Sequence, residues 1–202
     1  MKKTIVYPIR FSINHKKTIY KTGENEFKEY INQKMIFPLN HVILNYIEED
    51  DEVCVLLVET IHPDRNTEEF VSDAKEEINA TLLGHCKSVE YKNIKTPYAS
   101  TKEELGQIYK SLCEAISPNS NVFVDFTFGP KYMPLILFCV LNYVEKYLEC
   151  SISKLIYGLF DTKKEDPGTM VDFTTLYLLN TFGAMFDGSK SSFDTFVGKI
   201  LE

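Results

Sequence analysis

The feature of this sequence that most constrains its fold is the alternation of short apolar runs with longer amphipathic segments. Several runs are apolar at consecutive positions, which is typical of strands in a parallel sheet, since helices cover both faces of such a sheet. Strands are expected at residues 4–10, 52–60, 88–94, 121–127 and 154–160. This order of elements predicts the α/β class, with a Rossmann-like, open and mainly parallel sheet and helices on both faces.

Helix-start signals precede several of the segments between these runs. Glu104 follows Thr101 at the spacing of a capping box, and Asn66 with Glu69 shows a similar pattern. Pro38 suits the first turn of a helix, because the N–H that proline lacks is not needed there. Helices are expected at residues 39–49, 68–82, 103–116, 133–148, 174–186 and 192–201.

Two parts of the chain depart from the simple alternation. Residues 11–37 are polar and turn-rich, and this segment is too long for an ordinary loop between a strand and a helix. We expect it to form a hairpin or a lid that covers a bound ligand, because it follows the first strand directly. We also expect a Rossmann-like domain at residues 1–173 and a C-terminal helical appendage at residues 174–202.

Charge and cysteine usage limit the expected partners. The formal net charge of −7 argues against a basic face for long nucleic acid. The cysteines have no Cys-x-x-Cys spacing and share no ligand spacing with the histidines, so we expect a reducing cytoplasm, no disulfide framework and no metal. The longest apolar stretch, residues 133–141, is too short to span a bilayer. Without a G-x-G-x-x-G or P-loop motif, we expect no dinucleotide cofactor.

Two strand ends carry residues that could bind a ligand, since open parallel sheets bind ligands at the carboxyl ends of their strands. Arg10 at the first end could form a bidentate contact with a phosphate, or pair with a surface carboxylate such as Glu24 or Glu26. Lys131, near the start of an expected helix, opposes the helix dipole unless an anion lies nearby.

Other residues at these two ends each have two interpretations. Asp125 lies in an apolar run, so its carboxylate needs donors, and it either caps backbone N–H groups of the next turn or faces a ligand. Thr127 and Gly129 suit the close approach of a nucleotide, and a tight turn equally well. Ser12 by itself is typical of a turn or a cap.

Residues 125–134 read Asp-Phe-Thr-Phe-Gly-Pro-Lys-Tyr-Met-Pro, and Tyr157-Gly158 follows in the next strand. This pattern resembles the Asp-x-Thr-x-Gly-x-(Arg/Lys)-x-x-Pro signature of the CRISPR-associated Rossmann fold (CARF) family, and the order of elements agrees over most of the chain. Phe128 stands where this branch often has His, and Lys131 where it often has Arg. The ammonium of lysine is a compact charge, whereas the planar guanidinium of arginine can bind a phosphate through two parallel hydrogen bonds. The phosphate contact at residue 131 would therefore differ from that of the family.

The resemblance implies a sensor of type III CRISPR systems that binds a cyclic oligoadenylate, either tetra- or hexa-adenylate, across the two-fold axis of a homodimer. The helix at residues 133–148 would supply dimer contacts. The implied ligand-binding residues are Ile9, Arg10, Phe11, Ser12, Asp125, Thr127, Phe128, Gly129, Pro130, Lys131 and Tyr132.

Functions of different classes stay open. One is a pure sensor, acting alone or as the sensor part of a larger effector. Another is a metal-independent ring nuclease, in which Ser12 would orient the attacking ribose and Lys131 would neutralise charge on the pentacovalent phosphate. A third is an ordinary α/β protein that binds a mononucleotide in the same crevice.

Overall fold

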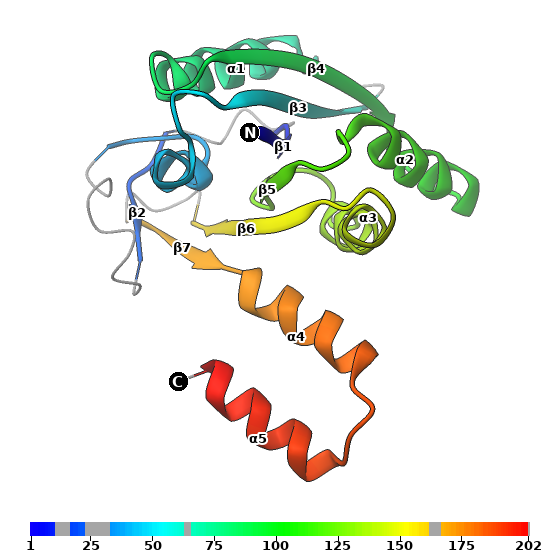
Figure 1. Cartoon of the computed structure of the whole chain (residues 1–202). Helices are drawn as coiled ribbons and strands as arrows, with labels where there is room; N and C mark the ends of the chain where they lie inside the picture. The colour runs from blue at the N-terminus through cyan, green and yellow to red at the C-terminus, as the bar shows by residue number, and fades with distance from the viewer. Residues whose placement is uncertain (11–16, 23–32, 63–65, 162–166, 202) are drawn as a thin grey trace.

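The computed structural model describes residues 1–10, 17–22, 33–62, 66–161 and 167–201. Its centre is a seven-stranded sheet with strand order β2-β7-β6-β5-β1-β3-β4 (Figure 1). The strands are β1 (Lys2–Pro8), β2 (Tyr20–Lys21), β3 (Glu52–Ile61), β4 (Ser88–Pro97), β5 (Asn121–Asp125), β6 (Ser151–Leu159) and β7 (Gly168–Asp172). All neighbouring strands pair in parallel except β6 and β7. The predicted α/β class with a mainly parallel sheet is therefore confirmed.

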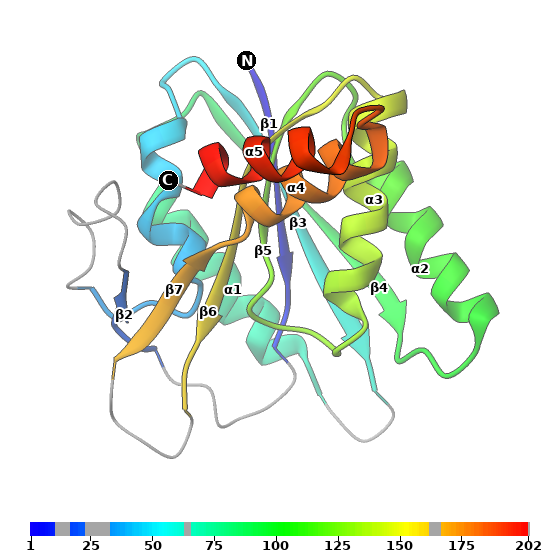
Figure 2. The ribbon, with the colours of Figure 1, turned by 90° about the horizontal axis from the view of Figure 1, so that it is seen from below.

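Helices lie on both faces of the sheet, and a helical hairpin follows at the C-terminus (Figures 1 and 2). One face packs against the 3-10 helices η2 (Pro38–His41) and η3 (Ile43–Tyr46) and against α1 (Glu68–Leu82). The opposite face packs against α2 (Lys102–Ala115) and α3 (Met133–Tyr147). The hairpin consists of α4 (Thr174–Met185) and α5 (Lys190–Leu201).

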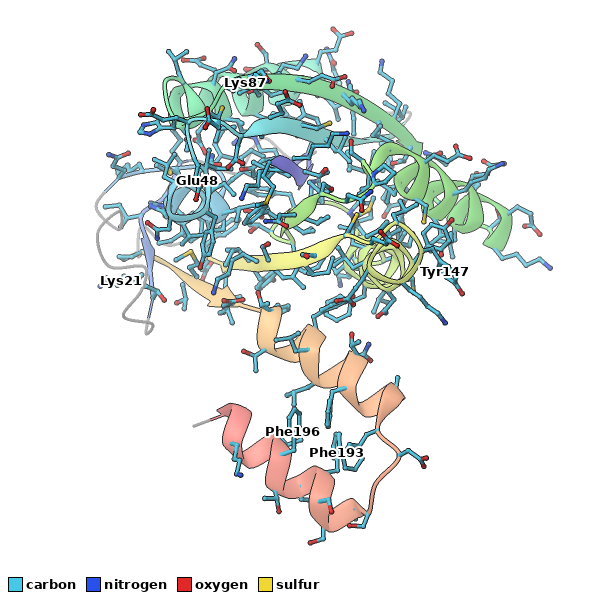
Figure 3. All side chains as sticks on the ribbon, in the orientation of Figure 1. Lys21, Glu48, Lys87, Tyr147, Phe193 and Phe196 are labelled. Carbon is cyan, nitrogen blue, oxygen red and sulfur yellow. The ribbon has the colours of Figure 1, made fainter. Side chains whose placement is uncertain are left out.

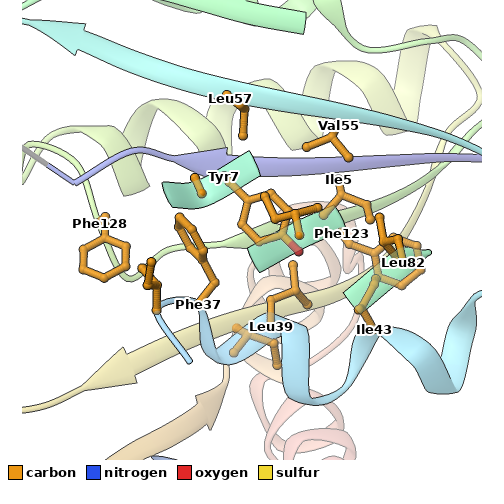
Figure 4. Packing of buried hydrophobic residues seen from close by; sticks show 14 of the residues in the cluster. Ile5, Tyr7, Phe37, Leu39, Ile43, Val55, Leu57, Leu82, Phe123 and Phe128 are labelled. Carbon is orange, nitrogen blue, oxygen red and sulfur yellow. The ribbon is translucent and has the colours of Figure 1, made fainter. Parts of the chain in front are cut away.

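The central strand β1 divides the core into two clusters. Ile5, Tyr7 and Ile9 point toward the η2, η3 and α1 face, and Val6 points toward the α2 and α3 face. This alternation follows from the two-residue period of a strand. Figure 4 shows Tyr7 beside Phe37 in the first cluster, where their ring centroids are 4.8 Å apart.

The α-helix predicted at residues 39–49 is wrong, because the chain forms the two short 3-10 helices there. Val42 separates them with a φ of −118°. Asparagine and β-branched residues are weak helix formers, and this segment contains several of both. The backbone N–H of Leu39 donates instead to the side chain of Asp125, 3.0 Å away. A side chain from elsewhere in the chain thus takes over part of the hydrogen bonding.

The two predicted capping patterns have different outcomes. Thr101 and Glu104 form the complete capping box at the start of α2, as predicted. The reciprocal box predicted from Asn66 and Glu69 does not form, because Thr67 is the N-cap of α1, but the Asn66 side chain does accept from the first-turn backbone N–H of Glu68 at 3.0 Å. The Thr67 hydroxyl donates instead to the buried carboxylate of Glu59.

The segment expected to be a hairpin or a lid is described only in part. Tyr20 and Lys21 form the edge strand β2 beside β7, and Thr18 makes an isolated antiparallel bridge to Met35. The Tyr20 ring lies so close to β6 that a Cβ on Gly158 would be 2.7 Å from its Cε1 atom. Residues 11–16 and 23–32 lie outside the described part, so a lid over a ligand stays a prediction.

Candidate functional site

The carboxyl ends of β1 and β5 form the switch point of the sheet. β1 pairs with β3 on one side and with β5 on the other. After the short edge strand β2, the chain continues to β3 and β4 on one side of β1, and it then returns to β5 on the other side. In open α/β sheets, ligands bind in the crevice at this position. The two strand ends predicted from the sequence are therefore direct neighbours.

Asp125 and Thr127 fix the turn that follows β5. The Asp125 side chain is buried, and it accepts hydrogen bonds from the backbone N–H of Thr127 at 2.9 Å and of Leu39 at 3.0 Å. The Thr127 hydroxyl accepts from the backbone N–H of Gly158 in β6 at 2.9 Å. Of the two interpretations of Asp125, the structure thus bears out the one in which it caps the next turn.

The environment of Asp125 perturbs its ionisation. Burial raises the pKa of its carboxyl from 3.8 to about 6, although the hydrogen bonds from Thr127 and Leu39 act in the opposite direction. The negative charge of Glu77 adds to the increase in this pKa. The carboxyl therefore titrates close to neutral pH inside the scaffold of the site.

Gly129 brings the turn after β5 against the end of β1. Its φ is +98°, a conformation that residues with a Cβ rarely adopt. A Cβ at this position would lie 3.2 Å from Cβ of Pro8 and 3.3 Å from Cβ of Met133. The close approach of the two strand ends therefore requires glycine here.

Lys131 and the start of α3 lie just beyond this glycine. The Lys131 side chain is exposed, and no ion pair links it to another residue in the described ranges. No side chain caps α3, whose N-cap is Tyr132. The Met133 N–H already donates to the carbonyl of Pro130, and Pro134 has no N–H. The helix start therefore offers few free donors, and it is the exposed ammonium of Lys131 that favours an anion here.

Tyr132 ties the start of α3 to the turn between β4 and α2. Its hydroxyl accepts from the backbone N–H of Ala99 at 2.8 Å and donates to the carbonyl of Pro97 at 3.3 Å. The Tyr98 ring lies 6.2 Å from the Tyr132 ring and 5.1 Å from the His62 ring, between centroids. The rings of His62, Tyr98 and Tyr132 therefore form an aromatic group at the carboxyl ends of β3 and β4. Within this group, the side chain of Tyr98 is 46% exposed.

Tyr98 is a residue of this candidate site that the sequence did not indicate. The available signal was its position directly after β4, at the same edge of the sheet as the other candidates. A single tyrosine after a strand carries little information, because only the fold shows that Tyr132 lies beside it.

Arg10 lies against α1. One of its terminal nitrogens is 2.6 Å from Oδ2 of Asp73, and its guanidinium carbon is 4.9 Å from the centre of the Phe70 ring. The side chain is about nine-tenths buried. Glu24 and Glu26, the partners considered from the sequence, lie outside the described residues. The structure therefore gives Arg10 a carboxylate partner in α1.

The remaining predicted residues are mostly part of the core. Ile9, Phe128 and Pro130 are buried, and the Phe128 ring packs 5.4 Å from the ring of Phe37. Phe11 and Ser12 lie outside the described residues, so the predicted role of Ser12 stays a prediction.

A cavity of about 320 Å³ lies elsewhere, between η2, η3 and the second half of α1. Its lining includes Lys17, Lys34, Glu76 and His85, so its walls carry charges of both signs. It does not reach the ends of β1 and β5, and none of the predicted ligand-binding residues lines it. The ends of β1 and β5 remain the better candidate, because the ammonium of Lys131 suits an anion and the neighbouring rings of Tyr132 and Tyr98 suit an aromatic base.

Within the described ranges, no group of three or more His, Cys, Asp or Glu side chains is arranged to hold a metal ion. Within the same ranges, no helix combines the length and the apolar character needed to cross a membrane. Comparison with known proteins identifies no relative, since no family model matches the chain and no curated protein matches it.

Proposed function

We propose that this chain is a sensor domain of the CARF type that binds a cyclic oligoadenylate in a type III CRISPR response. The ligand site lies at the ends of β1 and β5, and two copies of the chain face one ring. The observation that carries the proposal is the turn Asp125-x-Thr127-x-Gly129-x-Lys131. It packs against β1 at the switch point and presents an exposed ammonium at an uncapped helix start.

The electrostatics of the site favour a small, local anion. The chain as a whole carries a net charge of −7, which opposes binding of extended polyanions. The exposed ammonium of Lys131 concentrates positive potential at one point beside the ends of β1 and β5. A ring with few phosphates suits this distribution better than a long nucleic acid does.

The aromatic group next to this point supports a nucleotide rather than a simple anion. Tyr98 and His62 present ring surface at the same edge of the sheet, and Tyr132 connects them to the start of α3. Bases stack on such rings with little dependence on sequence. The site thus combines a phosphate-binding part with a base-binding part.

The decisive experiment measures binding of cyclic tetra- and hexa-adenylate to the purified protein and to two variants. Lys131→Ala should weaken binding of the preferred ring by about tenfold or more, because it removes a charge-assisted hydrogen bond. Lys146→Ala is the matched control, since it removes an exposed lysine from the other end of the same helix. Equal effects of the two substitutions, or no binding of either ring, would refute the proposal.

Product analysis in the same samples separates the sensor from related functions. Tight binding without turnover in the presence of EDTA supports the sensor. Linear products that disappear in Lys131→Ala would instead assign a metal-independent ring nuclease. A mononucleotide that binds where both rings fail would assign an ordinary nucleotide-binding protein.

A further inference from the structure

The guanidinium of Arg10 is a buried cation just after β1. Lys21, Glu48 and Lys87 lie on the surface of the molecule, as charged side chains usually do (Figure 3). The Arg10 side chain, in contrast, is only 10% exposed. A buried charge is stable when an opposite charge accompanies it. What Arg10 can do therefore depends on the anion that it contacts.

In this structure that anion is Asp73, on the second turn of α1. Oδ2 of Asp73 is 2.6 Å from Nη2 of Arg10, and the Phe70 ring covers the guanidinium carbon at 4.9 Å. The Asp73 side chain is 41% exposed. The ion pair therefore has a buried cation and a carboxylate that solvent reaches.

The pair lies at the edge of the sheet where the ligand is proposed to bind. α1 follows β3, so its first turns lie near the carboxyl end of β3. This end is beside the end of β1, since Pro8 is in register with Val58. On the other side of β1, the turn after β5 approaches Pro8 at Gly129, and Lys131 follows. Arg10 and Lys131 are thus cations at neighbouring strand ends.

Arg10 cannot neutralise Asp73 and a phosphate at the same time. A guanidinium carries one positive charge, whereas the carboxylate and each phosphate of a nucleotide ring carry one negative charge. A phosphate on the same guanidinium would lie close to the Asp73 carboxylate, and these like charges repel each other. The net charge of −7 adds to this repulsion. Asp73 and a phosphate are therefore competing acceptors.

We infer that Asp73 is an internal competitor of the ligand: it holds Arg10 in the unliganded chain, and Arg10 exchanges it for a phosphate when the ring binds. The inference rests on the proposed function and adds regulation to the same site. Arginine donates to carboxylates and phosphates with the same planar group, so the exchange replaces one charge-assisted contact by another. A ligand that also contacts Lys131 compensates for the lost pair better than a single phosphate does.

The alternative is an ion pair that only fastens α1 to β1. The two roles predict effects of different sign when the Asp73 charge is removed. A fastening pair that is lost lowers the stability of the chain and leaves ligand binding unchanged or weaker. A competitor that is lost also lowers the stability of the unliganded chain, but it strengthens ligand binding. The sign of the change in affinity therefore separates the two roles.

Equilibrium binding of cyclic tetra- and hexa-adenylate to Asp73→Asn tests the inference. Asparagine keeps the size of the side chain and binds Arg10 through a weaker, neutral acceptor, so the preferred ring should bind about tenfold more tightly. Urea denaturation without ligand should show that the same variant is less stable than the unmodified chain. The replaced side chain is 41% exposed, so circular dichroism should show a folded protein.

Glu69→Gln is the matched control. Glu69 is an exposed carboxylate four residues before Asp73 on the same helix, and its substitution removes the same unit of charge. It should leave the affinity for the ring within about twofold, because salt screens an exposed charge that has no contact with Arg10. The double variant Arg10→Gln/Asp73→Asn should bind the ring as Arg10→Gln does, since Asp73 acts through Arg10.

Three results would each overturn the inference: unchanged or weaker ring binding by Asp73→Asn, an equal gain in Glu69→Gln, or a gain from Asp73→Asn that persists in the absence of Arg10. In all three the unmodified chain still binds a ring, so the proposed function stands. Failure of every variant and of the unmodified chain to bind either ring would instead refute the proposed function, and the inference with it.

Discussion

The two faces of the sheet are held together by different chemistry. Under η2, η3 and α1, the buried carboxylates of Glu77 and Asp125 accept hydrogen bonds from the chain that packs over them. Under α2 and α3, the corresponding space contains Val124, Leu137 and Leu141, with no exposed surface or almost none. Regular helices satisfy their own backbone groups and need only apolar contacts. The irregular segment of residues 36–46 needs acceptors from other elements.

Glu77 is the main acceptor on the polar face. It accepts from the backbone N–H of Ile36 at 2.8 Å and of Phe37 at 3.0 Å, and from the side-chain amide of Asn40 at 3.0 Å. Tyr7 donates to the same Asn40 side chain at 2.6 Å. Burial raises the pKa of the Glu77 carboxyl, and these donors lower it in part. One side chain of α1 therefore positions the segment that in turn donates to Asp125.

The largest effect is expected on this polar face. Glu77→Ala removes the shared acceptor of three buried donors and should lower the free energy of unfolding by about 4 kcal/mol. Urea denaturation of Glu77→Ala, with Glu76→Ala as the control, measures this loss in the free energy of unfolding. Glu76 is the exposed neighbour on the same helix, and its substitution should change stability by less than about 0.5 kcal/mol. Similar results for both would remove the proposed contrast between the faces.

On the apolar face, a substitution should act through volume alone. Leu141→Ala deletes a fully buried side chain and should lower the free energy of unfolding by about 3 kcal/mol. No titratable group is involved, so this loss should be equal at pH 5 and pH 7. A clear change with pH would show that the apolar face contains a titrating group after all.

The smallest of the three effects is expected at Asp125, and it should depend on pH. Asn has only one side-chain oxygen, so Asp125→Asn leaves one of two backbone donors without an acceptor and should lower stability by about 2 kcal/mol at pH 7. The folded-state pKa near 6 lies above the ordinary value of 3.8. The folded state therefore binds the proton more tightly, and the contribution of this group to stability falls as the pH rises from about 4 to 6.

The difference in stability between the unmodified chain and Asp125→Asn should therefore be larger at pH 5 than at pH 7, by about 1 kcal/mol. Urea denaturation at both pH values measures it, and Leu141→Ala serves as the reference without a pH-dependent part. A difference of the opposite sign would mean that hydrogen bonding outweighs burial in setting the pKa of Asp125.

The sequence predicted those parts of the fold that local pattern determines. The apolar runs located β1, β3, β4, β5 and β6 and the switch point, but not the edge strand β2 or its neighbour β7, and Thr101 with Glu104 predicted the start of α2. Interactions between distant residues were not predictable in this way. Asp73, which pairs with Arg10, is 63 residues away in the sequence, and Asp125 is 86 residues from Leu39. For the same reason the sequence indicated an α-helix over residues 39–49, where acceptors from elsewhere stabilise 3-10 turns.

Strand β6 connects the turn after β5 to the start of the C-terminal hairpin. Near its carboxyl end, the N–H of Gly158 donates to the Thr127 hydroxyl in the signature turn. Near its middle, the N–H of Leu155 donates to the Thr174 hydroxyl at the first residue of α4. A strand inside a sheet changes length very little, so a shift of Thr127 along this direction would be carried to the base of the hairpin. We therefore expect that a displacement of Thr127 would also change the position of α4, because both are hydrogen-bonded to this one strand.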